Sequence, residues 1–102
     1  MDIVALVDDL MDRSRVSAAL PATRFVRDAS DLGPADVVIV DLARHAAAVR
    51  AIREQSPVVR IVGFGRHDDR VALDRAERDG ANTVLARSRF FQDPAAAVDA
   101  TS

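Results

Sequence analysis

Short, continuous apolar runs alternate along this chain with stretches in which apolar residues recur at helical spacing. The runs are rich in valine and isoleucine, which is typical of strands buried on both faces of a sheet. The strongest run ends in Asp41, and another ends in Asp8-Asp9. The runs predict five strands, at residues 2–7, 23–27, 36–41, 58–64 and 82–86.

The stretches between the runs predict helices. Pro21 ends the first helix, and Asp93-Pro94 begins the last one, with Asp as the cap and Pro at the first helical position. Arg13 and Arg15 of the first helix are expected to face water. Its core-facing side chains are expected to be Leu10, Met11, Val16 and Leu20. The expected helices cover 10–20, 46–55, the segment from a cap at Asp68 or Asp69 to Gly80, and 94–98.

Strand and helix alternate through the whole sequence, which favours a parallel sheet with helices on both faces. Too few repeats are present for an eight-stranded barrel, so we expect an open, doubly wound α/β domain of flavodoxin-like type over 1–102. The segment 28–35 is too short for a full crossover helix, which usually needs a dozen residues or more. We therefore expect the second helix to be reduced to a turn. The last helix is also short.

Composition narrows the chemistry. The 102 residues include no cysteine, which excludes disulfides, thiol catalysis and cysteine-based metal sites. All 14 basic residues are arginine, so any mechanism that needs a lysine amine is excluded as well. The net charge is −2, which does not favour a nucleic-acid partner. The sequence has neither a membrane-length apolar run nor a signal-peptide pattern, so a cytoplasmic protein is expected.

Aspartates follow the first and third predicted strands. Because the carboxyl ends of neighbouring parallel strands meet at one edge of the sheet, Asp8, Asp9 and Asp41 are expected to converge there. Three close carboxylates repel one another unless a cation, an arginine or a raised pKa relieves the charge. Oxygen ligands of this kind favour Mg²⁺. The alternative is that each aspartate only caps the helix or loop that follows it.

Three sequence features resemble the receiver domain of two-component response regulators. They are Val7-Asp8-Asp9, Asp41 after the third strand, and Asp79-Gly80-Ala81 before the fifth. The resemblance covers nearly the whole chain and implies a five-stranded sheet in the order 2-1-3-4-5. It also implies that Asp41 is the phosphoacceptor, that Asp8 and Asp9 form the metal pair, and that Ala43 supplies a backbone carbonyl to the metal. A histidine kinase or a downstream regulator would then be the protein partner.

The chain also departs from the receiver pattern. Gly65 stands where the family has a Ser or Thr that contacts the phosphoryl group, and Arg87 stands where it has a Lys. Ser88 replaces the usual Pro, and Val84 replaces the aromatic switch residue. We expect phosphorylation of Asp41 to be slow, with the Arg87 guanidinium reaching the acidic pocket as a built-in counter-ion.

The sequence thus predicts a stand-alone, atypical receiver-like signalling module that acts through protein contact and is not an enzyme. One alternative is a pseudo-receiver that works without phosphorylation, and a less favoured one is a small nucleotide- or flavin-binding domain. A homodimer stays open, because the reduced helices could uncover apolar surface.

Two further motifs are present in the sequence. The segment 63–69, with its Gly-x-Gly start, lacks the dinucleotide fingerprint. The segment 87–91 combines two arginines with two phenylalanines, which are expected to pack the last helix onto the sheet. His45 and His67 are expected to be surface residues at the same strand ends as the aspartates.

Overall fold

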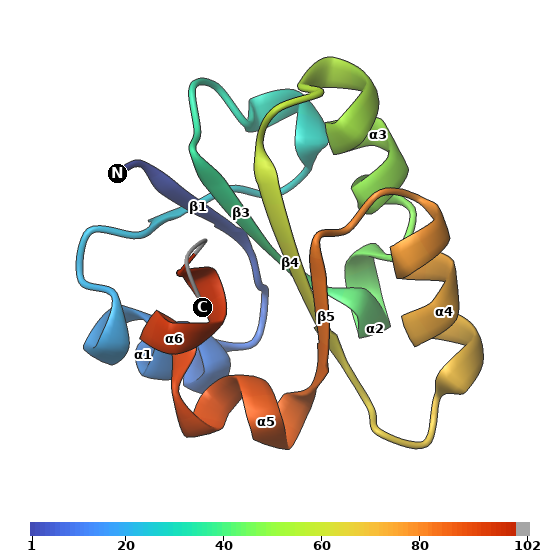
Figure 1. The fold of residues 1–102 in the computed structure, drawn as a ribbon. Coiled ribbons are helices and arrows are strands. Elements are labelled where there is room, and N and C mark those ends of the chain that lie inside the picture. Colours follow the sequence, from blue (N-terminus) through green and yellow to red (C-terminus); the bar gives the residue numbers. More distant parts are fainter. Residues whose placement is uncertain (100–102) are drawn as a thin grey trace.

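The computed structural model describes residues 1–99, which form a five-stranded parallel sheet in the order β2-β1-β3-β4-β5 (Figure 1). The expected fold class and strand order are confirmed. The central strand β3 pairs along its length with β1 and β4, in a register that sets Val38 opposite both Val4 and Ile61. The strands are β1 (Ile3–Leu6), β2 (Arg24–Phe25), β3 (Val37–Asp41), β4 (Arg60–Gly65) and β5 (Thr83–Ala86).

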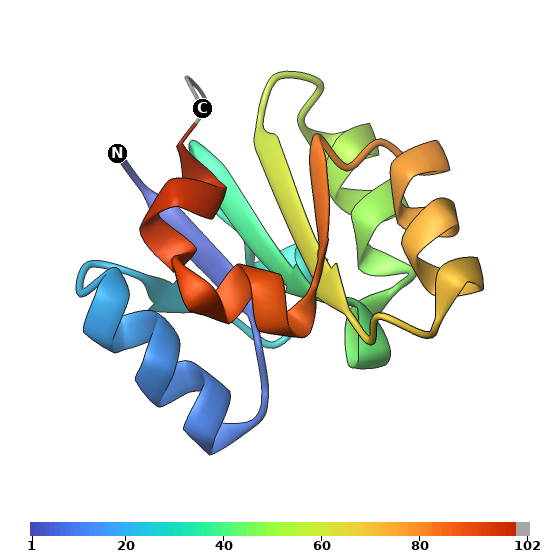
Figure 2. The same ribbon diagram turned by 60° about the horizontal axis from the view of Figure 1, so that its bottom comes forward.

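Helices cover both faces of the sheet (Figure 2). One face carries α1 (Leu10–Ala19), α5 (Arg87–Gln92) and α6 (Pro94–Val98). The other face carries the 3₁₀ turn η1 (Ala29–Asp31), α2 (Leu42–His45), α3 (Ala48–Gln55) and α4 (Arg70–Arg78). No helix within residues 1–99 is long and apolar enough to cross a membrane.

The buried sheet explains the continuous apolar runs. In β3, Val38 and Val40 belong to the core under α3 and α4, whereas Val37 and Ile39 belong to the core under α1 and α5. Alternate side chains of a strand point to opposite faces, so a strand covered on both sides needs apolar residues at every position.

The expected inward face of the first helix is wrong in two positions. Leu10 is 78% exposed and Met11 is 67% exposed, whereas Asp12 and Val16 are buried. Residues four apart share a helix face, and Asp12 and Val16 are the buried residues of α1. An arginine from another element pairs with the Asp12 carboxylate. Arg13 is half-buried rather than fully in water, and its Nε donates to the carbonyl of Val7 at 2.6 Å.

Two helix assignments also change. The expected helix at 46–55 corresponds to α3, and a further short helix, α2, which was not expected, begins directly after Asp41, which caps it. The helix α5 was not expected either, because it follows β5 without a side-chain cap and Phe90 is its one fully buried residue. The reduced second helix is confirmed, because a single turn, η1, occupies its place.

The shortened second helix leaves no open gap beneath it. Ala29 of η1 and the following Leu32 are both buried in the core. Large exposed apolar side chains occur instead at Leu10 and Met11 and, elsewhere in residues 1–99, at Met1, Val58 and Val71. Within residues 1–99, no large exposed apolar side chain therefore lies at η1 or directly beside it in the chain.

Gly80 makes the turn from α4 into β5 and adopts a φ of +115°, a region that L side chains rarely enter. A Cβ added there would lie 2.9 Å from Cγ of Arg53. We expect Gly80→Ala to destabilise the protein by more than about 1 kcal/mol, because both strain and crowding oppose it. Urea unfolding measures this. Gly33→Ala is the control for strain alone, because φ is +61° there and the nearest atom, in the Arg24 guanidinium, is 3.4 Å away. Equal losses would show that crowding adds nothing.

Candidate functional site

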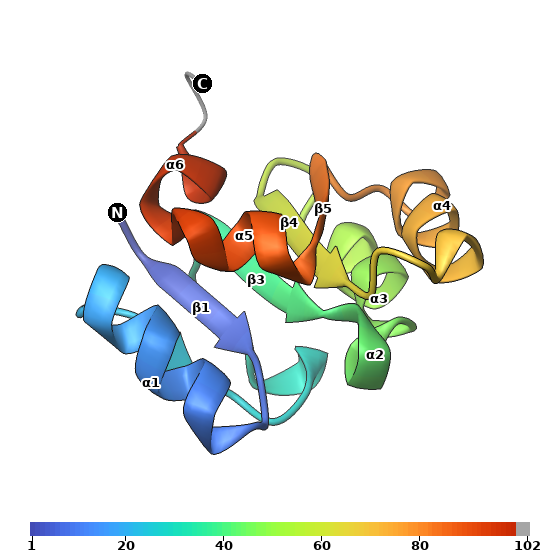
Figure 3. The same cartoon turned by 90° about the horizontal axis from the view of Figure 1, so that it is seen from below.

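Three aspartates and three arginines meet in a cavity of about 400 Å³ at the carboxyl ends of the strands. Figure 3 shows this edge, where the ends of β1 and β3 lie next to the starts of α1 and α2. Such an edge is where open α/β sheets bind ligands. The residues lining the cavity include Asp9, Asp12, Asp41, Ala43, Arg44 and Arg87.

Asp41 ends β3 and caps α2. Asp41 is only 5% exposed, and its Oδ1 accepts a hydrogen bond from the backbone N–H of Ala43 at 3.1 Å. Burial raises the pKa of Asp41 above its usual value, while the Ala43 N–H and the nearby charge of Arg87 partly counter that rise. This carboxyl group therefore keeps its proton more readily than a surface aspartate.

The two aspartates after β1, Asp8 and Asp9, have different partners. Asp9 caps α1, with its Oδ1 accepting from the backbone N–H of Asp12 at 2.9 Å, and it lines the cavity with Asp41. Asp8 is not among the residues that line the cavity. Its Oδ2 lies 3.1 Å from Nε2 of His45. Both aspartates lie at the expected edge, but the structure places only Asp9 beside Asp41. His45 is half-buried, whereas His67 is on the surface as expected.

Arg87, at the start of α5, pairs with Asp12 rather than with the predicted aspartates. Its Nη1 and Nη2 donate to the two Asp12 oxygens at 2.9 and 2.8 Å. Asp12 is 4% exposed, so this two-pronged contact neutralises a buried charge. The hydrogen bonds to Asp12 raise the pKa of Arg87, which stays charged. The guanidinium also lies 5.7 Å from the ring centre of Phe64 and 5.2 Å from that of Phe91.

Sequence reasoning missed Asp12, although one signal for it was present. Asp12 and Val16 are four residues apart, so an inward Val16 places Asp12 on the same helix face. A carboxylate on a core-facing position needs a partner, and arginine was the only basic residue type available. The expected packing of the phenylalanines is confirmed, since Phe90 stacks on Phe64 with ring centres 4.8 Å apart.

Two of the positions that depart from the receiver pattern, Gly65 and Val84, carry no replacement chemistry. Gly65, at the end of β4, is buried, and a Cβ there would lie 3.3 Å from Cδ2 of Leu73. A hydroxyl-bearing side chain would therefore have to displace its neighbour slightly. Val84 of β5 is half-buried and packs on the core under α3 and α4, where it offers no aromatic ring to move.

The predicted metal ligands are only partly brought together. Within residues 1–99, no group of three or more His, Asp or Glu residues is placed to hold a metal ion. Asp9 and Asp41 nevertheless line one cavity with Ala43, and Mg²⁺ is often held by one or two carboxylates while it keeps several waters. These residues fit a loosely held magnesium ion, which would supply positive charge at the Asp41 carboxylate.

Solved response-regulator receiver structures share this fold. A response regulator protein from Burkholderia pseudomallei, solved with a phosphorylated aspartic acid, a calcium ion and citrate, matches with a TM-score of 0.80 at 17% identity. The match covers 98% of this chain and 67% of that one. The isolated REC domain of RcsB from Salmonella enterica serovar Typhimurium matches with a TM-score of 0.71 at 14% identity, over 92% of this chain and 81% of that one.

NtrX from Brucella abortus, solved with ADP, matches with a TM-score of 0.73 at 22% identity. The match covers 84% of this chain and only 23% of the NtrX chain, so the present chain spans about a quarter of that protein. No protein-family model and no curated protein matches the sequence. The chain therefore has the receiver-domain fold, and its function has to be argued from the site.

Proposed function

We propose that this chain is an atypical receiver-like signalling module that acts through protein contact, with Asp41 as its phosphoacceptor. The observation that carries the proposal is the buried Asp41 carboxylate, which lines a cavity at the strand ends together with an arginine. A histidine kinase or a downstream regulator is the proposed protein partner, and nucleic acid and membrane are not. The proposal includes no enzymatic activity.

The chemistry at Asp41 is a phosphoryl transfer. Oδ1 is engaged by the Ala43 N–H, while within residues 1–99 no hydrogen bond is seen at Oδ2. We assign Oδ2 as the nucleophile: it bonds to the phosphorus of a phosphodonor while the bond from phosphorus to the leaving group breaks. The leaving imidazole of a phosphohistidine takes up a proton. Arg87 contributes positive charge from its place beside Asp12.

Phosphorylation should be slow. Gly65 provides no hydroxyl to the phosphoryl oxygens, and loss of one such donor typically costs on the order of 3 kcal/mol of transition-state stabilisation. The two terminal nitrogens of Arg87 also donate to Asp12, so the guanidinium is not directed at Asp41. The reduced machinery gives weight to a second candidate function, a pseudo-receiver that binds its partner without any phosphoryl transfer.

A phosphodonor assay separates the two candidates. The chain is incubated with a small-molecule phosphodonor and followed by intact mass. We expect slow gain of one phosphoryl group by the native chain and none by Asp41→Asn. Asp36→Asn, at an exposed aspartate that precedes β3, is the matched control and should behave as the native chain. No mass gain over many hours would leave the interaction-only function.

Magnesium is the proposed metal of this site, with Asp9 and Asp41 as the residues that would hold it. We expect MgCl₂ to raise the melting temperature of the native chain, because a ligand that binds only the folded state stabilises it. Asp9→Asn should lose that response, whereas Asp68→Asn, outside the cavity, should retain it. Equal responses in all three proteins, or no response in any, would exclude a metal held by Asp9.

The raised pKa of Asp41 predicts a pH-dependent effect of Asp41→Asn. The folded chain holds the Asp41 proton to higher pH than the unfolded chain does, so stability falls as pH rises from 3.8 through the raised pKa. Asn cannot ionise and can still accept from the Ala43 N–H. We therefore expect Asp41→Asn to be more stable than the native chain near neutral pH, with the gain shrinking as pH falls through the raised pKa toward 3.8. Urea unfolding across this range measures the effect; a gain that is unchanged with pH would contradict it.

A further inference from the structure

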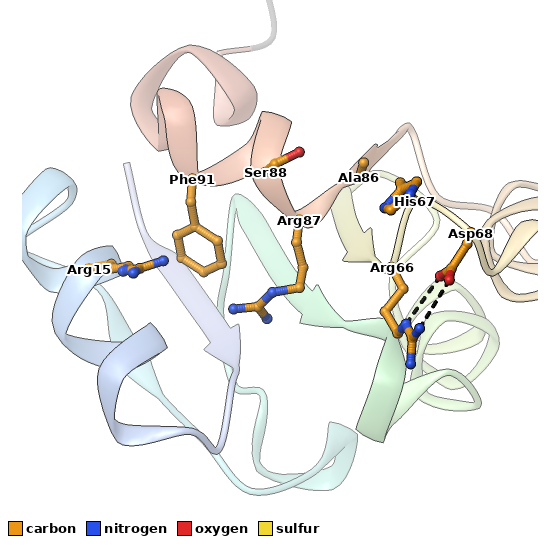
Figure 4. Close-up of a pocket in the computed structure, with 8 residues that line it drawn as sticks. All are labelled: Arg15, Arg66, His67, Asp68, Ala86, Arg87, Ser88 and Phe91. Carbon is orange, nitrogen blue, oxygen red and sulfur yellow. Dashed lines mark hydrogen bonds and ion pairs between the residues drawn. The ribbon is translucent and has the colours of Figure 1, made fainter.

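A second cavity, of about 360 Å³, lies beside the aspartate cavity, and its lining holds more arginines than aspartates. Figure 4 shows its wall, with Arg15 and Phe91 on one side, Arg66 and His67 on the other, and Arg87 between them. Its volume is within the range of small-ligand sites, which is about 300–1,000 Å³. Arg15 and Arg87 line both cavities.

The cavity joins the two further motifs of the sequence, within 63–69 and 87–91. The loop after β4, within 63–69, contributes Arg66, His67 and Asp68, and the start of α5, within 87–91, contributes Arg87 and Ser88. These motifs are far apart in the sequence and meet because β4 and β5 are neighbours whose carboxyl ends coincide. Neither the phosphoacceptor Asp41 nor the metal residue Asp9 lines this cavity.

Positive charge dominates its lining, which holds three arginines against a single aspartate in a chain whose net charge is −2. Two of the arginines are already oriented: Arg66 donates to both oxygens of Asp68 at 3.1 and 3.0 Å, and Arg87 is held by Asp12. Arg15 has no carboxylate partner within residues 1–99 and lies 5.6 Å from the ring centre of Phe91. One full positive charge therefore faces the cavity without a counter-ion from this part of the chain.

We propose that this cavity binds the phosphate group of a small phosphomonoester, with Arg15 and Arg66 supplying charge and the Ser88 hydroxyl donating a hydrogen bond. The uncompensated charge of Arg15 attracts an anion, and a phosphomonoester carries about two negative charges where a carboxylate carries one. Guanidinium groups present paired N–H donors that suit phosphate oxygens. The binding is non-covalent and does not require transfer to Asp41. Because Arg87 lines both cavities, an occupied phosphate site would alter the charge felt by Asp41.

The test titrates the ¹⁵N-labelled chain with AMP, inorganic phosphate and sulfate, each at constant ionic strength, and follows the backbone amide signals. We expect AMP and phosphate to bind and to shift the signals of His67 and Ser88. Arg15→Gln combined with Arg66→Gln should weaken binding by at least about tenfold, the loss expected for charged hydrogen bonds. Both residues are exposed, so this variant should keep the native amide spectrum elsewhere.

Arg89→Gln is the matched control, because Arg89 is on the same helix as Arg87 but does not line this cavity. It should bind phosphate as the native chain does. Binding by phosphate but not by AMP would overturn the phosphomonoester assignment. Equal binding of sulfate and phosphate, an unchanged affinity in the double variant, or shifts confined to other parts of the sheet would overturn the site. Failure of phosphorylation at Asp41 would leave this result unaffected, so the two proposals fail separately.

Discussion

Arg53→Ala is expected to lower the free energy of unfolding by about 3 kcal/mol, because charged hydrogen bonds are each worth about 1.5–3 kcal/mol and several are lost together. The half-buried Arg53 guanidinium joins the end of α3 to the turn before β5. Its Nη2 donates to the Gly80 carbonyl at 2.9 Å and to Asn82 Oδ1 at 2.8 Å. Its Nη1 donates to the carbonyls of Ser56, Pro57 and Val59.

The loss of stability should exceed that from the Arg53 hydrogen bonds alone, since Asn82 Oδ1 also accepts from the backbone N–H of Ile61 at 2.8 Å. Removing the guanidinium therefore loosens the point where β4 begins. For a domain of this size, such a loss corresponds to a fall in melting temperature on the order of 10 °C or more. Thermal and urea unfolding both measure it.

Arg50→Ala is the matched control for Arg53→Ala. Arg50 is on the same helix, its side chain is 74% exposed, and its one ion pair within residues 1–99 is with Glu54 at 3.2 Å. An exposed pair of this kind is worth about 0.2–1 kcal/mol, so the control should melt nearly as the native chain does. Arg53→Lys should recover little, because an ammonium group cannot reach acceptors on both sides. Similar losses for Arg50→Ala and Arg53→Ala would contradict the assigned role.

Arg87→Ala is expected to cost about 2 kcal/mol, less than the roughly 3–5 kcal/mol for breaking a fully buried ion pair. The reduction follows from exposure, because the Arg87 side chain is 40% exposed while that of Asp12 is only 6% exposed. The variant leaves the Asp12 carboxylate buried without its partner. It also removes the cation that lies over the rings of Phe64 and Phe91, at 5.7 and 5.2 Å from their centres.

A double-mutant cycle isolates the Arg87–Asp12 pair. Combining Asp12→Ala with Arg87→Ala should cost less than the sum of the single variants by at least about 1 kcal/mol, because the second change removes the stranded charge. If magnesium shares the counter-ion role, MgCl₂ should restore part of the stability that Arg87→Ala loses. An Arg87→Ala chain that melts as the native one does, with and without magnesium, would exclude any such role.

Local patterns in the sequence predicted the layered architecture. Continuous apolar runs such as 36–41 are satisfied by a sheet covered on both faces, and the reduced second helix, expected from the length of 28–35, is confirmed. The strand order, which the receiver resemblance implied, is confirmed as well. The aspartates after β1 and β3 lie at the expected edge because a parallel sheet places all its carboxyl ends together. Period and spacing act over a few residues, so the sequence displays them directly.

Pairings between distant side chains depended on the tertiary structure. Asp12 and Arg87 are 75 residues apart. The spacing to Val16 marks Asp12 as core-facing, but nothing in the local pattern indicates that its partner lies at the start of α5. The choice of His45 as the partner of Asp8 likewise depends on how α2 folds back after Asp41.

The same reason explains why Arg53 was not predicted. Its acceptors are mostly backbone carbonyls, which every residue carries and no sequence motif marks. The second cavity, lined by Arg15, Arg66 and Arg87, also forms only when the ends of β4 and β5 lie beside α1. The sequence by itself determined the sheet and the edge at which its chemistry gathers. Only the packing of helices on that sheet decided which charges meet, because an ion pair is specified by where two elements come together in space.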